Sequence, residues 1–181
     1  MSQVPALEDA DQSGTKSALW SGMDQPTPRE ERAALALRTV RTLMRANFIS
    51  IAPEDTLLEA DRIMRLARIR HLPVVRNGLL VALLSHRDVL SASISALEKV
   101  DPVERLDHLR RIPVAEVMRG SLYTATEDTT LADAARRMLR AKIGCLPVVR
   151  PGPDGPTLCG LITESDLLRA AYAPDFTGAS D

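Results

Sequence analysis

The sequence lacks the features that mark membrane-spanning, secreted and metal-binding proteins. Its longest apolar run, Leu79–Leu84, is far too short to cross a bilayer, and its first residues show no basic start followed by an apolar stretch. Only two of the 181 residues are cysteines, and Cys145 and Cys159 form neither a metal-ligand pattern nor the disulfide framework of small secreted domains. We therefore expect a soluble cytoplasmic protein without a metal site.

An excess of charge of one sign is also missing. Lysine and arginine together number 23, and aspartate and glutamate 24, which gives a net charge of -1. No bulk basic field attracts nucleic acid or anionic lipid, so we expect neither a nucleic-acid nor a membrane partner. Aromatic residues make up only 3%, but hydrophobic residues reach 45%, which is ample for a core in a chain of this length.

The chain contains two copies of one unit. His71–Arg76 matches Cys145–Arg150 at an offset of 74, and 14 of the 33 residues from 44 to 76 are identical to their counterparts. Composition alone would give about two or three identities. The offset then becomes 78, because a turn-rich loop at Pro151–Pro156 replaces the tight turn of Asn77 and Gly78.

Each copy is predicted to form a strand, a helix, a hairpin and a second helix. Thr56 and Glu59 make a capping box, which satisfies free backbone N–H groups at a helix start. Apolar residues then recur at helical spacing, and the two segments after them are apolar on both faces, as in a covered sheet. The predicted elements of copy one are a strand at Phe48–Ala52, a helix from Leu57, hairpin strands at His71–Arg76 and Leu79–Ser85, and a helix from His86 to about Leu97. Copy two repeats this order from Leu122 to about Tyr172.

The hairpin pattern also places the two cysteines. Counted from the turn, Cys145 faces Ile162 and Cys159 faces Val148. Cys145 and Val148 differ by an odd number of positions and so lie on opposite faces of their strand. The cysteines therefore cannot meet at disulfide distance, and both are expected to be small buried hydrophobic residues.

A further helix is predicted before copy one. Thr27–Glu30 has the features of a helix start, and Ala33, Leu37 and Val40 then share one face, with arginines mostly elsewhere. We favour a packed helix with a solvated arginine face; the alternative is a face that docks nucleic acid or protein. The predicted organisation is a disordered tail at 1–26, this helix at 27–46, repeat one at 47–99, a helical linker at 100–113, repeat two at 114–173 and a C-terminal tail at 174–181.

Three segments of each copy carry a recognisable pattern. They are Ser50–Leu57, His71–Val75 and Leu83–Asp88 in copy one, and Thr124–Leu131, Cys145–Val149 and Gly160–Asp166 in copy two. The pattern resembles the cystathionine β-synthase (CBS) domain, which typically occurs in tandem pairs, over roughly residues 38–173. Two positions depart from it: Ala82 replaces the usual glycine, and Glu127 stands where copy one has Pro53.

The resemblance implies an α/β (α+β) fold of two βαββα CBS repeats, packed as a pseudo-twofold pair and preceded by an amphipathic helix. It also implies two clefts for adenosine-containing ligands. In these clefts the hydroxyl and carboxylate of an [ST]-x-x-D motif contact the ribose, and the first strand and an x-Leu-Pro turn flank the adenine. Carried over, site one uses Ser50, Ile51, Ala52, Leu72, Pro73, Ser85, Arg87 and Asp88, and site two uses Thr124, Ala125, Thr126, Leu146, Pro147, Thr163, Ser165 and Asp166.

The motif carboxylates have a second interpretation. Ser85 with Asp88, and Thr163 with Asp166, also fit a helix-capping box with aspartate in place of glutamate, which requires no ligand. An ionised carboxylate can equally accept the two hydroxyl donors of a ribose. The two roles are compatible, and both stay open at this point.

Charge differs between the copies beside these motifs. Arg70 and Arg87 give copy one a formal charge of +2 with two nearby histidines, whereas Glu164 gives copy two -1 at the corresponding positions. Arginine holds phosphate through paired N–H donors, and a carboxylate repels it. Arg70 and His71 therefore join the ligand-binding residues of site one, which we expect to be the better phosphate site. The alternative is ordinary surface variation.

The sequence favours a non-catalytic regulatory module that senses an AMP-, ADP- or ATP-like nucleotide. His71 and His86 are candidate acid–base residues, but no nucleophile, metal constellation or phosphate-cradling glycine loop accompanies them. No cofactor is expected beyond the regulatory nucleotide. The resemblance implies a homodimer, and regulation implies a protein partner that the sequence does not identify. The alternative is a protein-interaction or dimerisation module with vestigial clefts.

Overall fold

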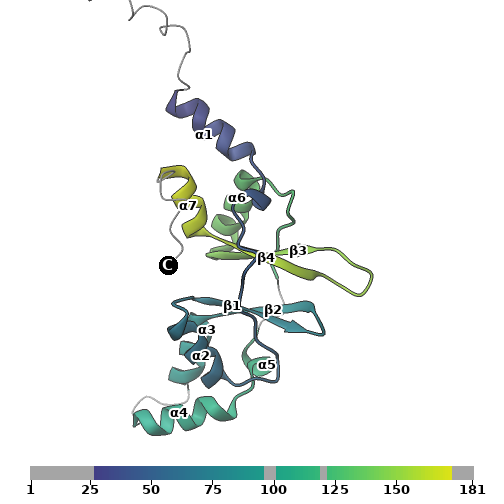
Figure 1. Cartoon of the computed structure of the whole chain (residues 1–181). Helices are drawn as coiled ribbons and strands as arrows, with labels where there is room; N and C mark the ends of the chain where they lie inside the picture. The colour runs from purple at the N-terminus through teal and green to yellow at the C-terminus, as the bar shows by residue number, and fades with distance from the viewer. Residues whose placement is uncertain (1–26, 96–100, 119–121, 173–181) are drawn as a thin grey trace, which may run out of the picture.

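The structure, a computed structural model, describes residues 27–95, 101–118 and 122–172. The tails predicted at 1–26 and 174–181 lie outside the described residues. The elements are α1 (Pro28–Leu37), a short 3-10 helix η1 (Val40–Thr42), α2 (Leu57–Leu66), β1 (His71–Arg76), β2 (Leu79–Ser85), α3 (His86–Ser95), α4 (Pro102–Arg111), α5 (Val114–Val117), α6 (Leu131–Ala141), β3 (Cys145–Arg150), β4 (Thr157–Thr163) and α7 (Glu164–Tyr172) (Figure 1).

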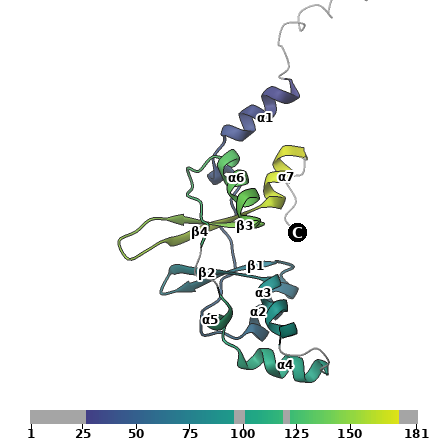
Figure 2. The same ribbon diagram turned by 180° about the vertical axis from the view of Figure 1, so that it is seen from behind.

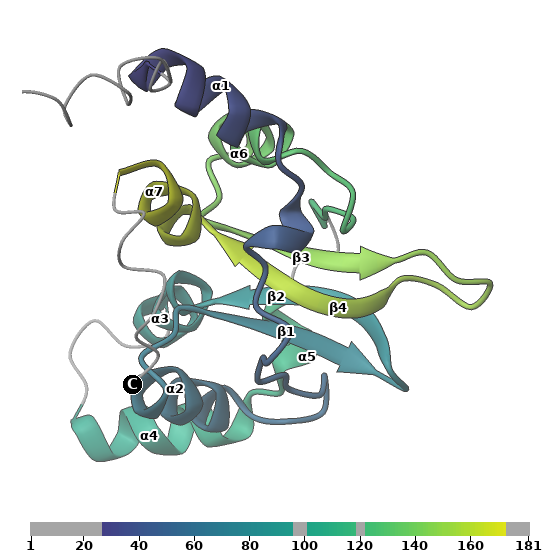
Figure 3. The same ribbon diagram turned by 45° about the horizontal axis from the view of Figure 1, so that its top comes forward.

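Each repeat supplies one antiparallel hairpin to a shared sheet. The strand order is β1-β2-β4-β3, and the hairpins join where Leu79 pairs with Thr157 and Leu80 N–H donates to the carbonyl of Pro156 (2.9 Å). Helices α2, α3 and α4 lie on one side of the hairpins and α1, α6 and α7 on the other (Figures 2 and 3). The predicted α/β pair of βαββα-like units behind an N-terminal helix is confirmed.

The first strand of each unit is reduced to a single bridge. Ile51 pairs in parallel with Val74 and makes backbone hydrogen bonds of 3.0 and 2.9 Å with the residues on either side of it. The next amide, on Ala52, donates to Asp55 Oδ2 (2.8 Å) instead, so the strand predicted at Phe48–Ala52 ends in a turn. The corresponding residue of repeat two forms the same bridge with β3.

A bulge in each hairpin shifts the predicted register by one residue. In repeat two the bulge follows Val148, so the β3–β4 pairing skips Cys159. Cys145 therefore faces Thr163 rather than Ile162, and the prediction that Cys159 faces Val148 is wrong. Cys145 is buried as predicted, whereas Cys159 is only partly buried, and both are free thiols. Counting outward from a turn cannot detect a bulge.

The N-terminal helix ends earlier than predicted, at Leu37 rather than at residue 46. Thr27 begins it with the predicted capping box. Arg38 then adopts an extended conformation, and its carbonyl accepts the N–H of Leu131 (2.8 Å), which stops the helix. As a result Leu37 is 76% exposed, while Val40 on η1 is fully buried.

Each repeat is completed by the segment that precedes the other repeat. α1 packs against α6 and α7, and Val40 belongs to the core of repeat two. α4 and α5 pack against α2 and α3, and supply Leu109 and Val114 to the core of repeat one (Figure 1). Isolated backbone bridges hold both segments in place. This crosswise packing predicts that the two repeats fold as one unit.

Leu109 tests the contribution of the linker helix to repeat one. We expect Leu109→Ala to lower the free energy of unfolding by about 2–5 kcal/mol, because the substitution leaves a cavity in that core. Leu106→Ala on the same helix, where the side chain is 46% exposed, should change it by less than about 0.5 kcal/mol. Urea denaturation followed by circular dichroism measures both, and equal losses would contradict the assignment.

Candidate ligand-binding clefts

The hydroxyl–carboxylate motif of repeat one caps helix α3. Ser85 donates to Asp88 Oδ2 through both its N–H (2.9 Å) and its Oγ (2.5 Å). Asp88 N–H donates back to Ser85 Oγ (3.3 Å). Because the motif spans the end of β2 and the start of α3, strand and helix together fix the half-buried carboxylate.

The same arrangement recurs in repeat two at the start of α7. Thr163 donates to Asp166 Oδ2 through its N–H (2.9 Å) and Oγ1 (2.6 Å), and Asp166 N–H donates back to Thr163 Oγ1 (3.3 Å). Asp166 is only 8% exposed. The capping interpretation therefore holds in both copies, and in both the cap uses the Oδ2 oxygen.

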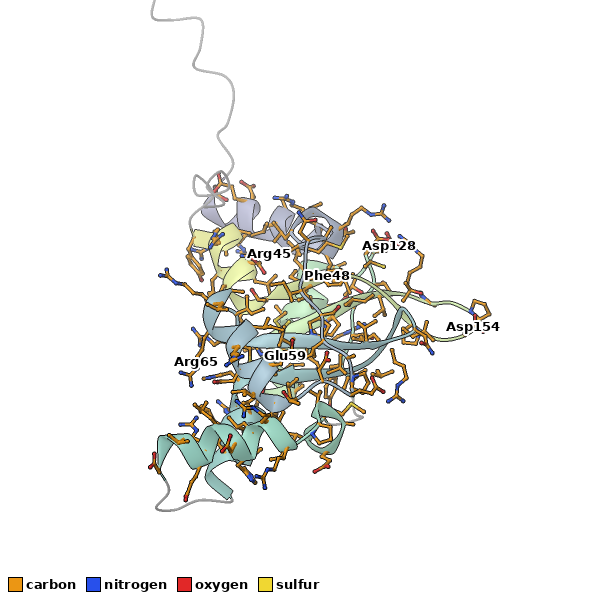
Figure 4. All side chains as sticks on the ribbon, turned by 60° about the horizontal axis from the view of Figure 1, so that its bottom comes forward. Arg45, Phe48, Glu59, Arg65, Asp128 and Asp154 are labelled. Atoms are coloured by element: carbon orange, nitrogen blue, oxygen red, sulfur yellow. The ribbon has the colours of Figure 1, made fainter. Side chains whose placement is uncertain are left out.

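The other oxygen of Asp166 binds a residue from outside its repeat. Arg45 Nε and Nη2 donate to Asp166 Oδ1 at 3.1 and 2.8 Å. Reciprocal backbone hydrogen bonds with Leu161 on β4 (2.8 and 3.0 Å) hold the Arg45 main chain in place. Figure 4 shows Arg45 beside the yellow helix α7.

The segment between α1 and the bridge at Ile51, residues 38–50, crosses from repeat two to repeat one, and we call it the crossing segment. Its close approach to β4 at Arg45 requires a glycine on that strand. A Cβ atom at Gly160 would lie 2.8 Å from the Arg45 carbonyl oxygen and 3.3 Å from Met44 Sδ. The nearer contact is with backbone, which cannot move aside without disturbing the Arg45–Leu161 pairing. The close approach gives a physical reason for glycine at the position where copy one has Ala82.

Arg45 is a site residue that sequence reasoning misses. It precedes repeat one in the chain, yet its partner belongs to repeat two. Alignment of the two copies matches positions within each repeat. It cannot identify a side chain that the segment ahead of one repeat contributes to the other repeat. The only signal in the sequence is that the offset of 74 aligns Arg45 with a second arginine, Arg119.

The predicted adenine-flanking residues come together in each repeat. Ile51 N–H donates to the Pro73 carbonyl (3.0 Å), and Ala125 N–H donates to the Pro147 carbonyl (2.9 Å). The first strand thus lies directly beside the Leu-Pro pair in both copies. The prediction of a turn at this pair is wrong, because Leu72 and Pro73 lie within β1, and Leu146 and Pro147 within β3. Among the remaining residues Ser50, Thr126 and Ser165 are exposed, Ala52 and Thr124 are half-buried, and Leu72 and Leu146 are buried.

The basic residues predicted for site one lie in different environments. Arg70 and Arg87 are exposed, whereas His71 is half-buried and faces Ser85 across the hairpin. Burial, followed by the charge of Arg70, lowers the pKa of His71 below its ordinary value, and Asp88 acts in the opposite direction. These surroundings favour the neutral form of His71 at pH 7 in the unliganded chain.

The two sites approach each other at His71. A Cβ atom at Gly144 would lie 3.3 Å from Glu164 Oε2 and 3.7 Å from His71 Cε1. The first residue of β1 in repeat one is therefore near the first residue of α7 in repeat two. A phosphate at this boundary would meet groups from both repeats.

A shallow cavity borders site two. Arg137 on α6 donates to the carbonyl of Thr124 at its edge (2.6 Å). The cavity is lined by Leu122, Tyr123, Thr124, Arg137, Arg140 and Ala141. At the positions of Tyr123, Arg137 and Arg140, repeat one has Ile49, Ile63 and Leu66.

Arg45 and Arg137 add positive charge to site two that the sequence comparison of the motif positions does not count. Adding Arg45 to the -1 counted for site two brings its formal charge to 0, because -1 and +1 cancel. Arg137 adds a further cation at the edge of the same site. Site two therefore has cations that its motif positions leave out, and the preference of site one for phosphate stays a prediction.

The histidines of repeat one do not form a pair. His86 Nε2 lies 3.9 Å from Asp61 Oδ1 on α2, whereas His71 lies near Asp88.

Within residues 27–95, 101–118 and 122–172, no three His, Cys, Asp or Glu side chains are grouped so as to hold a metal ion. No helix in the described part of the chain is long and apolar enough to cross a membrane.

Comparison with known proteins identifies the family. The model of the CBS domain matches residues 40–95 and 114–173, which together make up more than half of the chain. The chain therefore belongs to the CBS domain family and carries two copies of the domain, as the repeated motifs predict.

Similar proteins include both CBS proteins and an enzyme. A CBS domain-containing protein of Dictyostelium discoideum is 31% identical over 130 residues, which cover 71% of this chain and 88% of that protein. Inosine-5'-monophosphate dehydrogenase of Korarchaeum cryptofilum is 30% identical over 134 residues, which cover 74% of this chain but only 24% of the enzyme. The crystal structure of CBSX2 in complex with AMP superposes with a TM-score of 0.61 at 28% identity, covering 76% of this chain and 98% of that one.

The lowered pKa of His71 predicts a loss of stability in mild acid. Between the lowered folded pKa and the ordinary unfolded value of about 6.5, the unfolded chain binds the extra proton, so acidification favours unfolding. Above about pH 6.5 the imidazole is neutral in both states and contributes nothing. The free energy of unfolding of His71→Gln should therefore fall less than that of the wild type between about pH 7.5 and 5. Chemical denaturation at each pH measures this, with His108→Gln as the control; an unchanged fall in His71→Gln would contradict the prediction.

Proposed function

We propose that this CBS pair is a non-catalytic regulatory module that binds an adenosine nucleotide in its two clefts, with Asp88 and Asp166 accepting ribose hydroxyls. The observation that carries the proposal is the environment of Asp166. Its Oδ2 oxygen serves the helix cap, while its Oδ1 oxygen accepts two N–H donors from Arg45. The Asp166 carboxylate can thus accept two further hydrogen bonds besides those of the helix cap. The two hydroxyl groups of a ribose could donate such a pair.

A relative and the local geometry support an adenosine nucleotide as the ligand. CBSX2 is described in complex with AMP, and this chain matches nearly its full length. In both repeats the first strand is hydrogen-bonded to the Leu-Pro residues of β1 or β3, near the carboxylate motif. Adenine packed against these two bonded segments would place its ribose toward Asp88 or Asp166, and its phosphate toward the boundary at His71 and Glu164.

Regulation would arise because the clefts adjoin both repeats. A ligand shifts a conformational equilibrium only if it binds one arrangement more tightly than another. Arg45, from the segment ahead of repeat one, and Asp166, from repeat two, move apart or together when the crosswise packing changes. A nucleotide held at Asp166 therefore senses that packing, and a regulated protein partner would respond to it.

We also infer a homodimer. Leu66 at the end of α2 and Leu139 on α6 are 86% and 76% exposed, and Leu168 and Tyr172 on α7 are 59% and 71% exposed. A second copy of the chain is the occupant that would cover such helix faces, since the same residues recur on it. Light scattering should give twice the mass of one chain, and the mass of a single chain would contradict the dimer.

The ribose role of the motif carboxylates gives the principal test. Asp88→Asn and Asp166→Asn keep side-chain size but lose the charge-assisted acceptor, so each should weaken nucleotide binding by about 1.5–3 kcal/mol, on the order of tenfold to a hundredfold. Asp133→Asn is a control, because Asp133 also caps a helix start: Thr130 Oγ1 donates to its carboxylate, and its own N–H donates to Thr130 Oγ1. Calorimetric titration with AMP, ADP and ATP measures all three variants.

The alternative function makes a different prediction for the same measurements. A protein-interaction or dimerisation module with vestigial clefts would show no thermal shift with millimolar AMP, ADP, ATP, NAD or S-adenosylmethionine, because a ligand stabilises only the state that binds it. That result would overturn nucleotide sensing. Binding that Asp88→Asn and Asp166→Asn leave unchanged would limit the two carboxylates to capping.

A further inference from the structure

The ion pair between Arg45 and Asp166 joins an exposed cation to a buried anion. The side chain of Arg45 is 55% exposed, whereas that of Asp166 is 8% exposed. Both guanidinium donors converge on one oxygen, Oδ1, at 2.8 and 3.1 Å. The guanidinium therefore covers the carboxylate oxygen that the helix cap does not use, and it does so from the solvent side.

We propose that Arg45 determines the charge of the ligand that site two accepts, by favouring an adenosine ligand that carries phosphate over one that does not. The inference rests on the proposed function, because it names the residue that sets ligand selectivity at the same site. The motif positions of repeat two do not identify this residue, because Arg45 reaches the site from the segment ahead of repeat one.

Selectivity follows from the competition for Asp166 Oδ1. A ribose hydroxyl that binds this oxygen must displace at least one of the two Arg45 donors. An uncharged nucleoside has no anionic group that could bind the displaced guanidinium, which is then hydrogen-bonded only to water. A 5'-phosphate on the same ribose offers an anion within reach of the same side chain, and arginine binds phosphate through paired donors. Only the phosphorylated ligand thus replaces the ion pair that it breaks.

The backbone keeps Arg45 in position when its side chain moves. The reciprocal hydrogen bonds with Leu161 are made by the main chain, and the absence of a Cβ at Gly160 permits the close approach. A guanidinium that leaves Asp166 therefore remains tethered at the edge of the site.

Arg41 is the matched control for Arg45. It lies four residues earlier on the same crossing segment and also forms ion pairs, with Asp128 (3.4 Å) and Glu127 (3.8 Å). Its side chain is 59% exposed, close to the 55% of Arg45. Replacing either arginine removes one positive charge from the segment, but only Arg45 contacts the motif carboxylate.

Adenosine and AMP differ only in the phosphate and therefore measure the selectivity directly. The full-length chain carrying Asp88→Asn, which weakens site one, is titrated with each ligand by calorimetry. In this background AMP should bind at least about tenfold more tightly than adenosine. Adding Arg45→Gln should reduce that ratio by about tenfold, through weaker AMP binding with adenosine affinity unchanged or improved, whereas adding Arg41→Gln should preserve it.

The remaining outcomes separate this inference from the proposed function. An AMP-to-adenosine ratio that is the same in Arg45→Gln and Arg41→Gln overturns the role of Arg45 alone. An equal loss of both ligands in Arg45→Gln also overturns it, because a residue that only supports the fold would weaken both. Absence of binding by either ligand to the wild-type chain overturns the proposed function, and the selectivity inference falls with it.

Discussion

The crosswise packing of the two connecting segments is the constraint on which the rest of the molecule depends. Neither repeat buries its core with its own residues alone: Val40 completes repeat two from the segment ahead of repeat one, and Leu109 and Val114 complete repeat one from the linker. A unit of some fifty residues buries a small share of its surface and is only marginally stable by itself. Exchanging these segments lets two marginal units form one domain.

The same packing builds the candidate sites. The motif carboxylates are positioned locally, because each caps the helix that follows its hairpin. The group that contacts Asp166 from outside, however, arrives on the crossing segment, and His71 approaches Glu164 across the boundary between the repeats. Under the proposed function, binding at the boundary would therefore be coupled to how the two repeats are held together, which is the property that a regulatory module requires.

Local features of the fold were predictable because they depend on neighbouring residues. The helix caps at Thr27, Thr56 and the two motif aspartates, the two hairpins and the duplication itself all follow from residue types at short spacing, although at Thr56 only the hydroxyl half of the predicted capping box is present. The hairpin register was not predictable, since the bulge after Val148 leaves no clear mark in the sequence. Likewise, an apolar stripe through Val40 indicates a helix, but it cannot show that the chain leaves the helix at Arg38 to pair with another element.

The site was predictable only within each repeat. Alignment of the copies identifies equivalent residues such as Asp88 and Asp166, but it does not identify their partners, and Arg45 lies more than a hundred residues from the carboxylate that it binds. Burial also changes the protonation state expected for one histidine. The sequence allows His71 to be a cation, whereas its surroundings in the fold favour the neutral imidazole. Tertiary contacts between distant segments account for both differences.

Native-state hydrogen exchange tests the crosswise packing most directly. The N–H of Val75 donates to Ile51 in the core of repeat one (2.9 Å), and that of Val149 donates to Ala125 in the core of repeat two (2.8 Å). If the exchanged segments make one cooperative unit, both amides exchange with the same free energy of opening, equal to that of global unfolding. A clearly lower value for one of the two amides would show that its repeat opens independently, and would contradict the account.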